Sequence, residues 1–452
     1  MRRLGPLDAA AIVVSNVIGG GIFFVPVIVA GLMPSPAAML GVWAFGGLLA
    51  FAGAMAYAEL ATIRPRAGGE YVYLRDAFGL GAAFLTGWTS FVAGFSGAIA
   101  AGAVALADYL GRFIPAAADT TPLLTVPLPF LPIAVTPQAI VAISAIVGLS
   151  LVHLRGSGRI VHNILAGLKV SALVVFIAIG LSLGTGSYEH LTITHEVASP
   201  ATTWVLALVP IMFTYSGWNA AAYVAEEIRD PGRNVPRALA LGTLSVVAIY
   251  LALNVVFVYA MPIGELAALP GARLTDTVAE RLFGFVAGNV LGAFTIVSIA
   301  ASISAMVMAG PRVYFAMARD GVFLPAAARV HPEHHTPALA IWAQAIWSAV
   351  LVLSGTLSQL VAYTGFAVVL FAGVAVAALF VLRQREPDAP RPYKALGYPV
   401  APALFVVASA VMVMYEVWNN PQTSLTGLAV IGAGIPIYLF FRRRLAGRAE
   451  AG

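Results

Sequence analysis

The sequence of 452 residues contains no cysteine and few charged residues. Without cysteine there is no disulfide framework, no thiolate metal site and no cysteine nucleophile. Charged residues make up 10% of the chain and hydrophobic residues 60%, whereas soluble domains carry about 25% charged residues. This composition excludes a soluble enzyme, a nucleic-acid-binding protein and a disordered chain. The net charge of +5 therefore needs an explanation other than a polyanionic partner.

Motifs of catalytic and cofactor sites are also missing. No nucleotide-binding loop, His-Glu-x-x-His motif or nucleophile elbow occurs, so the sequence predicts neither an enzyme nor a cofactor. His331, His334 and His335 lie close together, but their loop has no cysteine or orienting aspartate. We interpret this loop as solvated and predict no metal site there.

The chain has long apolar runs instead. Uncharged runs of about 18 residues or more are long enough to cross a hydrocarbon layer of ~30 Å as helices. We predict an all-α integral membrane protein with twelve transmembrane helices in a single domain, residues 1–452. The segments are roughly 8–32, 38–62, 77–110, 137–154, 160–183, 203–226, 236–262, 288–318, 337–355, 357–382, 399–418 and 424–441. Residues 122–136 are apolar too, but their four prolines exclude a helix in lipid and predict an ordered loop.

The basic residues lie on one side of this topology. Twelve crossings place both termini on the same side, and nearly all of the 25 lysines and arginines fall in loops or tails there. The exceptions are Arg112, Arg273, Arg281 and Lys169. The positive-inside rule therefore predicts that both termini are cytoplasmic. The excess of basic residues therefore reflects the orientation of the chain in the membrane. We expect the basic tail at 442–444 to contact lipid headgroups.

The first ten segments form two similar halves, about 8–183 and 203–382, followed by two further helices at about 399–441. Five helices per half is an odd number, so the second half must be inverted relative to the first. Each half opens with an interrupted helix, at residues 19–21 (Gly-Gly-Gly) and 215–217 (Tyr-Ser-Gly). Paired interruptions in inverted halves indicate a transporter's binding site near the middle of the membrane.

The two interruptions favour opposite charges. Three glycines favour local unwinding, which frees backbone N–H groups at the start of the next half-helix, near Ile22 and Phe23, for a carboxylate. The alternative interpretation is close helix packing through small residues. The break at 215–217 exposes carbonyl oxygens at the negative end of a half-helix, which suit an ammonium group. Together they predict a site for a zwitterion.

One charged residue lies within a predicted helix. Lys169 is about ten residues into the fifth segment, where a charge costs several kcal/mol unless it faces a cavity or a partner. We predict that it carries a proton or replaces a bound cation. The alternative is a side chain that extends to the cytoplasmic surface.

Acidic residues are absent from the middle of every predicted helix. Glu59 and Glu70 flank the second cytoplasmic turn, and Glu226 and Glu227 end the sixth helix. Without a carboxylate in the site, neutral substrates are favoured over cations, and a proton relay built on acids is disfavoured.

Several motifs resemble the amino acid, polyamine and organocation (APC) transporter superfamily over essentially the whole chain, closest to its L-type and bacterial amino acid exchanger branch. Residues 15–23 (SNVIGGGIF) resemble the first helix of that superfamily. The other matching segments are 57–60 (YAEL), 68–74 (GGEYVYL), 215–219 (YSGWN), 234–238 (NVPRA), 310–312 (GPR) and 391–394 (RPYK).

The resemblance implies a LeuT-like inverted five-plus-five fold that works by alternating access. It implies that amides around Gly20 bind a carboxylate, that carbonyls of Val17, Phe213 and Ser216 bind an amino group, and that the Phe213 ring acts as a gate. It also implies that Lys169 stands in place of a sodium ion. The predicted substrate-binding residues are Val17, Ile18, Gly19, Gly20, Gly21, Phe213, Thr214, Ser216 and Gly217. Many superfamily members have serine at the position of Gly20.

We therefore predict a sodium-independent secondary transporter of neutral L-amino acids in the bacterial cytoplasmic (inner) membrane. It would be either a proton-coupled symporter or an exchanger (antiporter). Its partners would be a neutral amino acid, membrane lipid and, in the symport alternative, protons, with no nucleic acid. The alternatives are a polyamine or organic cation carrier, and a non-transporting membrane sensor with the same fold.

Overall fold

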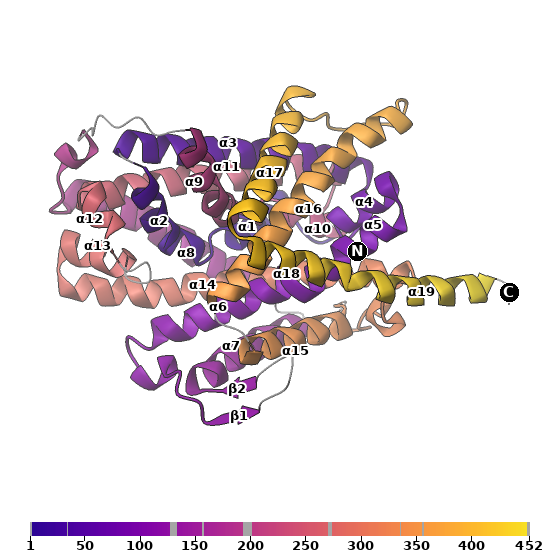
Figure 1. Ribbon diagram of the computed structural model, residues 1–452, viewed down its shortest axis with the longest axis horizontal. Helices are drawn as coiled ribbons and strands as arrows, with labels where there is room; N and C mark the ends of the chain where they lie inside the picture. The colour runs from indigo at the N-terminus through magenta and orange to yellow at the C-terminus, as the bar shows by residue number, and fades with distance from the viewer. Residues whose placement is uncertain are drawn as a thin grey trace.

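A computed structural model describes residues 2–33, 35–126, 133–155, 158–192, 201–269, 274–334, 336–354 and 357–449, most of which are helical (Figure 1). In the first half the helices are α1 (Pro6–Val17), the 3-10 turn η1 (Gly21–Phe23), α2 (Val25–Leu32), α3 (Pro36–Ile63), α4 (Glu70–Phe78), α5 (Leu80–Thr89), the π-helical turn η2 (Ser90–Gly94), α6 (Phe95–Leu110), η3 (Pro115–Ala118), α7 (Pro137–Leu154) and α8 (Gly158–Leu183). Two short strands, β1 (Leu124–Val126) and β2 (Ile133–Val135), lie between η3 and α7.

The second half begins after the 3-10 turn η4 (Tyr188–Leu191). Its helices are α9 (Ala201–Tyr215), α10 (Ala220–Tyr223), η5 (Ala225–Glu227), α11 (Pro231–Ala260), α12 (Ile263–Ala267), α13 (Leu274–Phe283), α14 (Phe285–Arg319), η7 (Pro325–Ala328), α15 (Ala338–Ser354), α16 (Leu357–Arg385), α17 (Val400–Asn419), α18 (Pro421–Gly432) and α19 (Gly434–Ala449). In Figure 1, α4 and α5 lie toward the end from which α19 projects, and α12 and α13 lie at the opposite end.

Within the described residues, nine helices are long and apolar enough to cross a membrane, and each coincides with a predicted segment. Three shorter apolar helices, α1, α9 and α15, coincide with the other three segments. Two of these, α1 and α9, are the first parts of the interrupted helices. The count of twelve crossings and the inverted repeat stay predictions.

The helix after the first break begins later than predicted. The expected start near Ile22 and Phe23 is wrong, because residues 21–23 form a 3-10 turn and α2 begins at Val25. Pro26 explains the position: it lacks an N–H group and has a fixed φ, so it is accommodated within the first turn of a helix.

The predicted loop at 122–136 contains a small hairpin. Leu124 pairs with Val135 and Val126 with Ile133 in an antiparallel ladder. Residues 127–132, with three of the four prolines, lie outside the described residues, as do His335 and Arg273.

α1 is the central helix and packs against α8, α11 and α14. Its contact with α11 is close, since a Cβ atom at Gly242 would lie 2.7 Å from Cβ of Val13. Small residues permit such close approach of helices where lipid replaces water. This packing fixes the end of α1, where the first break begins.

Candidate functional site

A cavity of about 820 Å³ lies where the two interrupted helices meet. Its walls come from the two breaks and from η2, α6, α14 and α16. Eight of the predicted site residues line it: Val17, Gly19, Gly20, Gly21, Phe213, Thr214, Ser216 and Gly217. Ile18 is fully buried and is not part of the wall.

The first break leaves backbone donors available. The N–H of Gly19 donates to the Val17 carbonyl at 2.7 Å, and the N–H groups of Phe23 and Phe24 donate to the Gly20 and Gly21 carbonyls. None of the described hydrogen bonds uses the N–H groups of Gly20 and Gly21. These donors border the cavity at the start of a helical turn, which is a favourable place for an anion.

The second break leaves a backbone acceptor available at Ser216. The Ser216 N–H donates to the Phe213 carbonyl at 3.0 Å, and the Thr214 carbonyl accepts a bond from the Tyr250 hydroxyl at 3.2 Å. The Ser216 carbonyl has no partner among the described hydrogen bonds. By contrast, the Val17 carbonyl accepts from Gly19 and from the Tyr250 hydroxyl, at 2.9 Å for the latter, so both of its lone pairs are in use. Ser216 is therefore the better candidate for an ammonium group.

The two breaks contact each other directly. A Cβ atom at Gly21 would lie 2.9 Å from Oγ1 of Thr214, and one at Gly217 would lie 2.4 Å from Nδ2 of Asn16. Gly217 also has a φ of +99°, a left-handed conformation that favours glycine. Gly20 is different, because a Cβ atom there would meet nothing within 4 Å. Only Gly20, of these three, has space for a side chain.

Lys169 lies behind the first break. It is fully buried in α8, and its Nζ donates to the Ser15 carbonyl at 3.2 Å and to the Ile18 carbonyl. The side chain does not extend to the surface, which removes that alternative. It holds a positive group against the carbonyl end of α1, where a helix dipole is negative. Its role in coupling stays a prediction.

Phe213, together with Phe24, lines both the main cavity and a smaller one of about 180 Å³. Its ring lies 3.2 Å from where a Cβ atom would stand at Gly365 of α16, so glycine leaves room for the ring. Its role as a gate stays a prediction.

The expectation that no carboxylate faces the site is wrong, because Asp108 of α6 lines the cavity and so does Glu70, which is buried. Its Oε1 accepts hydrogen bonds from the Tyr57 hydroxyl at 2.6 Å and from Nδ2 of Asn219 at 2.7 Å. Nδ2 of Asn219 also donates to the Tyr223 hydroxyl at 3.2 Å. Burial raises the pKa of the Glu70 carboxyl, and the hydrogen bonds from Tyr57, Tyr223 and Asn219 oppose that rise.

A sequence signal for this position is the Gly68-Gly69 pair. Both glycines have positive φ, +113° and +51°, and they turn the chain so that Glu70 begins α4 facing inward. A Cβ atom at Gly69 would lie 2.6 Å from the Tyr223 ring, so this turn packs directly on α10. Glu70 lies between two apolar runs in the sequence. A search for charges within those runs therefore does not reveal that the turn places its side chain on the cavity wall.

Other lining residues came from positions without a clear sequence signal. Asn16 and Ser302 contribute polar side chains, the π-helical turn η2 contributes Ser90 and Gly94, and Tyr109 lies near the far end of α6. π-helical turns often occur at functional sites. The predicted helix 77–110 is thus three elements, α5, η2 and α6.

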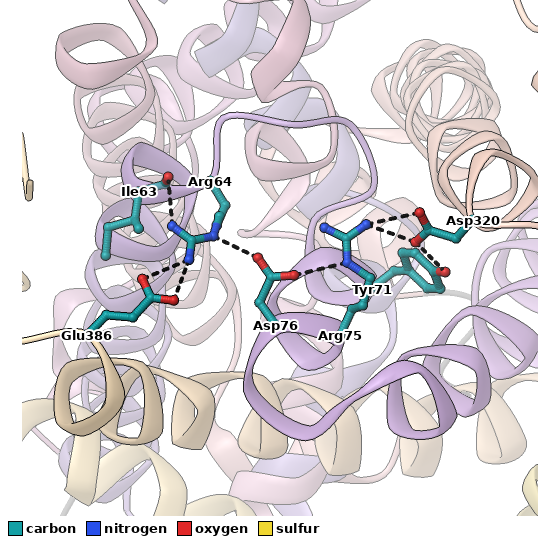
Figure 2. A network of polar contacts seen from close by, with 7 residues as sticks. All are labelled: Ile63, Arg64, Tyr71, Arg75, Asp76, Asp320 and Glu386. Atoms are coloured by element: carbon teal, nitrogen blue, oxygen red, sulfur yellow. Dashed lines mark hydrogen bonds and ion pairs between the residues drawn. The ribbon is translucent and has the colours of Figure 1, made fainter. Parts of the chain in front are cut away.

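Ionic contacts of Arg75 and Asp76 join α4 to neighbouring segments (Figure 2). Arg64 bonds to Asp76 at 2.7 Å and to Glu386, which follows α16, at 2.7 Å. Arg75 bonds to Asp76 at 2.9 Å and to Asp320, which follows α14, at 2.8 Å. Exposed ion pairs contribute only about 0–1 kcal/mol each, but a network that joins four segments restricts their relative motion.

Two of the three histidines of the predicted solvated loop, His331 and His334, lie among the described residues. The rings of His331 and His334 stack with centroids 4.7 Å apart. Within the described residues there is no group of three potential metal ligands.

The sequence of the chain matches a family model along almost its whole length. The model described as amino acid permease covers residues 4–441. The chain belongs to the amino acid permease family. It is therefore an integral membrane transporter of amino acids and not an enzyme, in agreement with the predicted superfamily and function.

Relatives of this permease include animal and bacterial transporters. It is 30% identical over 449 residues to the large neutral amino acids transporter small subunit 2 of Homo sapiens, covering 97% of this chain and 80% of the relative. It is 27% identical to the serine/threonine exchanger SteT of Bacillus subtilis, covering 98% of both chains. It is 29% identical to the Asc-type amino acid transporter 1 of Homo sapiens, covering 97% of this chain and 82% of the relative.

Proposed function

We propose that this permease exchanges neutral L-amino acids across the bacterial cytoplasmic membrane by alternating access, without sodium. The observation that carries the proposal is the meeting of two helix breaks on one cavity. Unused N–H groups of Gly20 and Gly21 lie on one side and the unused Ser216 carbonyl lies on the other. A zwitterion would place its carboxylate at the first break and its ammonium group at the second.

The rest of the cavity suits an apolar side chain. Its lining along α6, α14 and α16 is formed largely by small or hydrophobic residues: Ala98, Ala101, Gly102, Ala105, Ile299, Met306, Ala367, Val368 and Phe371. Its volume of about 820 Å³ lies within the range of about 300–1,000 Å³ of small-molecule sites. Aliphatic and aromatic amino acids would bury more apolar surface here than serine or alanine.

Lys169 supports independence from sodium. Its ammonium group already bonds to the Ser15 and Ile18 carbonyls beside the first break. The Lys169 side chain thus occupies carbonyl acceptors that a sodium ion at this place would need. The inverted repeat and cytoplasmic termini belong to the same proposal, with proton symport as the alternative mode of coupling.

One observation favours a second candidate, a carrier of organic cations such as polyamines. Glu70 and Asp108 both line the cavity. However, Glu70 already accepts hydrogen bonds from Tyr57 and Asn219, and Asp108 accepts one from the Gln138 amide, so part of their hydrogen-bonding capacity is satisfied. We therefore prefer neutral substrates.

Uptake of radiolabelled amino acids into proteoliposomes tests the proposal. We expect saturable leucine uptake that is stimulated by internal leucine, persists when choline replaces sodium, and is not inhibited by putrescine. Stimulation by a pH gradient without internal substrate would establish proton symport instead. No saturable uptake of any neutral amino acid under either gradient would overturn the proposal, and inhibition by putrescine but not alanine would favour the cation carrier.

A further inference from the structure

Glu70 forms a polar cluster at the floor of the cavity. It is 6% exposed, and its carboxylate accepts bonds from Tyr57 of α3 and Asn219 beside α10. Tyr57, Glu70 and Tyr223 are all deeply buried, so their bonds are shielded from solvent. Hydrogen bonds to an ionised carboxylate in such surroundings are stronger than those between neutral groups.

Glu70 stands on a fixed support. It is the first residue of α4, and Tyr71, Arg75 and Asp76 of the same helix belong to the network of Figure 2. This network ties α4 to the ends of α3, α14 and α16. The position of Glu70 therefore follows these helices.

Asn219, by contrast, belongs to the broken helix. α9 ends at Tyr215, residues 216–219 are not helical, and α10 has only four residues. A four-residue helix has little stability of its own and depends on contacts with its surroundings. The Asn219–Glu70 bond is such a contact, and it joins the break to α4.

The cluster also lies next to one face of the protein. We call N-terminal face the surface formed by the exposed residues Arg3, Arg66, Glu226, Arg229 and Asp230. The backbone N–H of Arg3 donates to the Glu227 carbonyl at 2.9 Å, and that of Ala67 donates to the Glu226 carboxylate at 2.9 Å. The N–H of Gly68 donates to the Tyr223 carbonyl at 3.2 Å. This bond joins the loop between α3 and α4 to the segment after the second break. It lies between the cavity and the N-terminal face.

We propose that Glu70 is the latch that closes the cavity toward the N-terminal face, by holding Asn219 and α10 against α4. The hydrogen bond between Asn219 and Glu70 must break before the cavity can open toward this face. Glu70 acts here as a positioning residue, through the conformation of the second break. The proposal rests on the proposed alternating access, but it concerns access to the cavity and does not depend on which amino acid is carried.

Because the chain has no cysteine, a single introduced cysteine would be its only thiol. In an Ala98→Cys background, which places the thiol on the cavity wall of α6, the rate of labelling by a membrane-impermeant thiosulfonate is measured from each face. Intact cells expose one face and inverted vesicles the other. The test variants are Glu70→Gln and Asn219→Ala, each of which removes or weakens the same bond. Glu333→Gln is the matched control, since Glu333 is exposed in a loop away from the cavity.

We expect both test variants to speed labelling from the N-terminal face by about tenfold or more, the effect of losing one charged hydrogen bond. The double variant should add little to either single one, because both act on one contact. The control should label like the parent. Unchanged labelling from that face in both folded variants, or fully additive effects, would overturn the latch. This result is independent of transport, so an absence of neutral amino acid uptake would overturn the proposed function and leave the latch assay valid.

Discussion

Gly20 and Gly21 are adjacent but have opposite surroundings. A Cβ atom at Gly20 meets nothing within 4 Å, whereas one at Gly21 lies 2.9 Å from Oγ1 of Thr214. We expect Gly20→Ser to keep the melting temperature and uptake while changing substrate preference, because a hydroxyl would enter the cavity. We expect Gly21→Ala to lose uptake, because it forces the two breaks apart. Melting temperature and KM for a panel of amino acids test this pair, and equal effects of both substitutions would contradict it.

Lys169 has a control in the only other lysine of the chain, Lys394, which is exposed. Lys169→Ala leaves the Ser15 and Ile18 carbonyls without their donor at the first break. We expect uptake to fall more than about tenfold, as for the loss of a positioned charge, while the protein still folds. Lys394→Ala should transport normally. Uptake at the wild-type rate by Lys169→Ala would show that the lysine is only structural.

Glu70 is expected to give the permease a pH dependence. Burial raises the pKa of its carboxyl, so falling pH neutralises it earlier than an exposed glutamate. The facing titratable groups, Tyr57, Tyr73 and Tyr223, are uncharged near neutral pH. Asp320 and Glu386, which follow α14 and α16, are paired with arginines, and Asp108, which also lines the cavity, accepts a hydrogen bond from Gln138.

A protonated carboxyl accepts hydrogen bonds less strongly and should release Asn219. Only the thiolate of the Ala98→Cys reporter reacts, so the labelling rate itself falls with pH in every variant. The Glu70→Gln variant lacks the titrating group and provides the reference: the ratio of the parent's labelling rate from the N-terminal face to that of Glu70→Gln should rise as pH falls from about 7 to 5. The same slope in this variant and in the parent would assign the dependence to another group.

At the scale of elements, the second break depends on Gly217. Alanine there would adopt a φ of +99° and collide with Asn16. Gly79 provides a control, because its φ is +90° but a Cβ atom would meet nothing within 4 Å. We expect Gly79→Ala to lose about 1 kcal/mol of stability and keep uptake, and Gly217→Ala to abolish uptake. Thermal melting and uptake separate backbone strain from collision; loss of uptake in both variants would implicate strain alone.

The apolar runs predicted the positions of the helices, because a segment that crosses the membrane must expose apolar side chains to lipid and satisfy its backbone hydrogen bonds within a helix. The triple glycine located the first break, since glycine weakens a helix locally, and Ser216-Gly217 located the second by its matching position in the second half. The apolar runs could not set the start of α2, which Pro26 decides, nor the π-helical turn η2, which has no composition of its own. Glu70 was missed because its burial results from the turn at Gly68 and Gly69 and from its packing on Tyr223, a contact between distant parts of the chain.

At the scale of the whole molecule, the predicted orientation can be tested with the same cysteine-free background. Arg66 is exposed on the N-terminal face, and Thr121 is exposed in the loop that follows α6. If both termini are cytoplasmic, Arg66→Cys should be labelled only in inverted vesicles and Thr121→Cys only in intact cells. The reverse pattern would invert the topology, and labelling of both sites from one side would contradict the number of crossings between them.

The direct contact between the two breaks has a consequence for the length of the substrate. Asn16 against Gly217, and Gly21 against Thr214, set the spacing between the proposed carboxylate and ammonium subsites by backbone packing. The distance between the two subsites would then match the distance between the carboxylate and the ammonium group of an α-amino acid, in which a single carbon atom joins them. β-Amino acids and dipeptides, in which the two groups are farther apart, would not bind whatever their side chains. Substitutions in the cavity walls of α6, α14 and α16 would alter the preference for the substrate's side chain and leave the distance between the subsites unchanged.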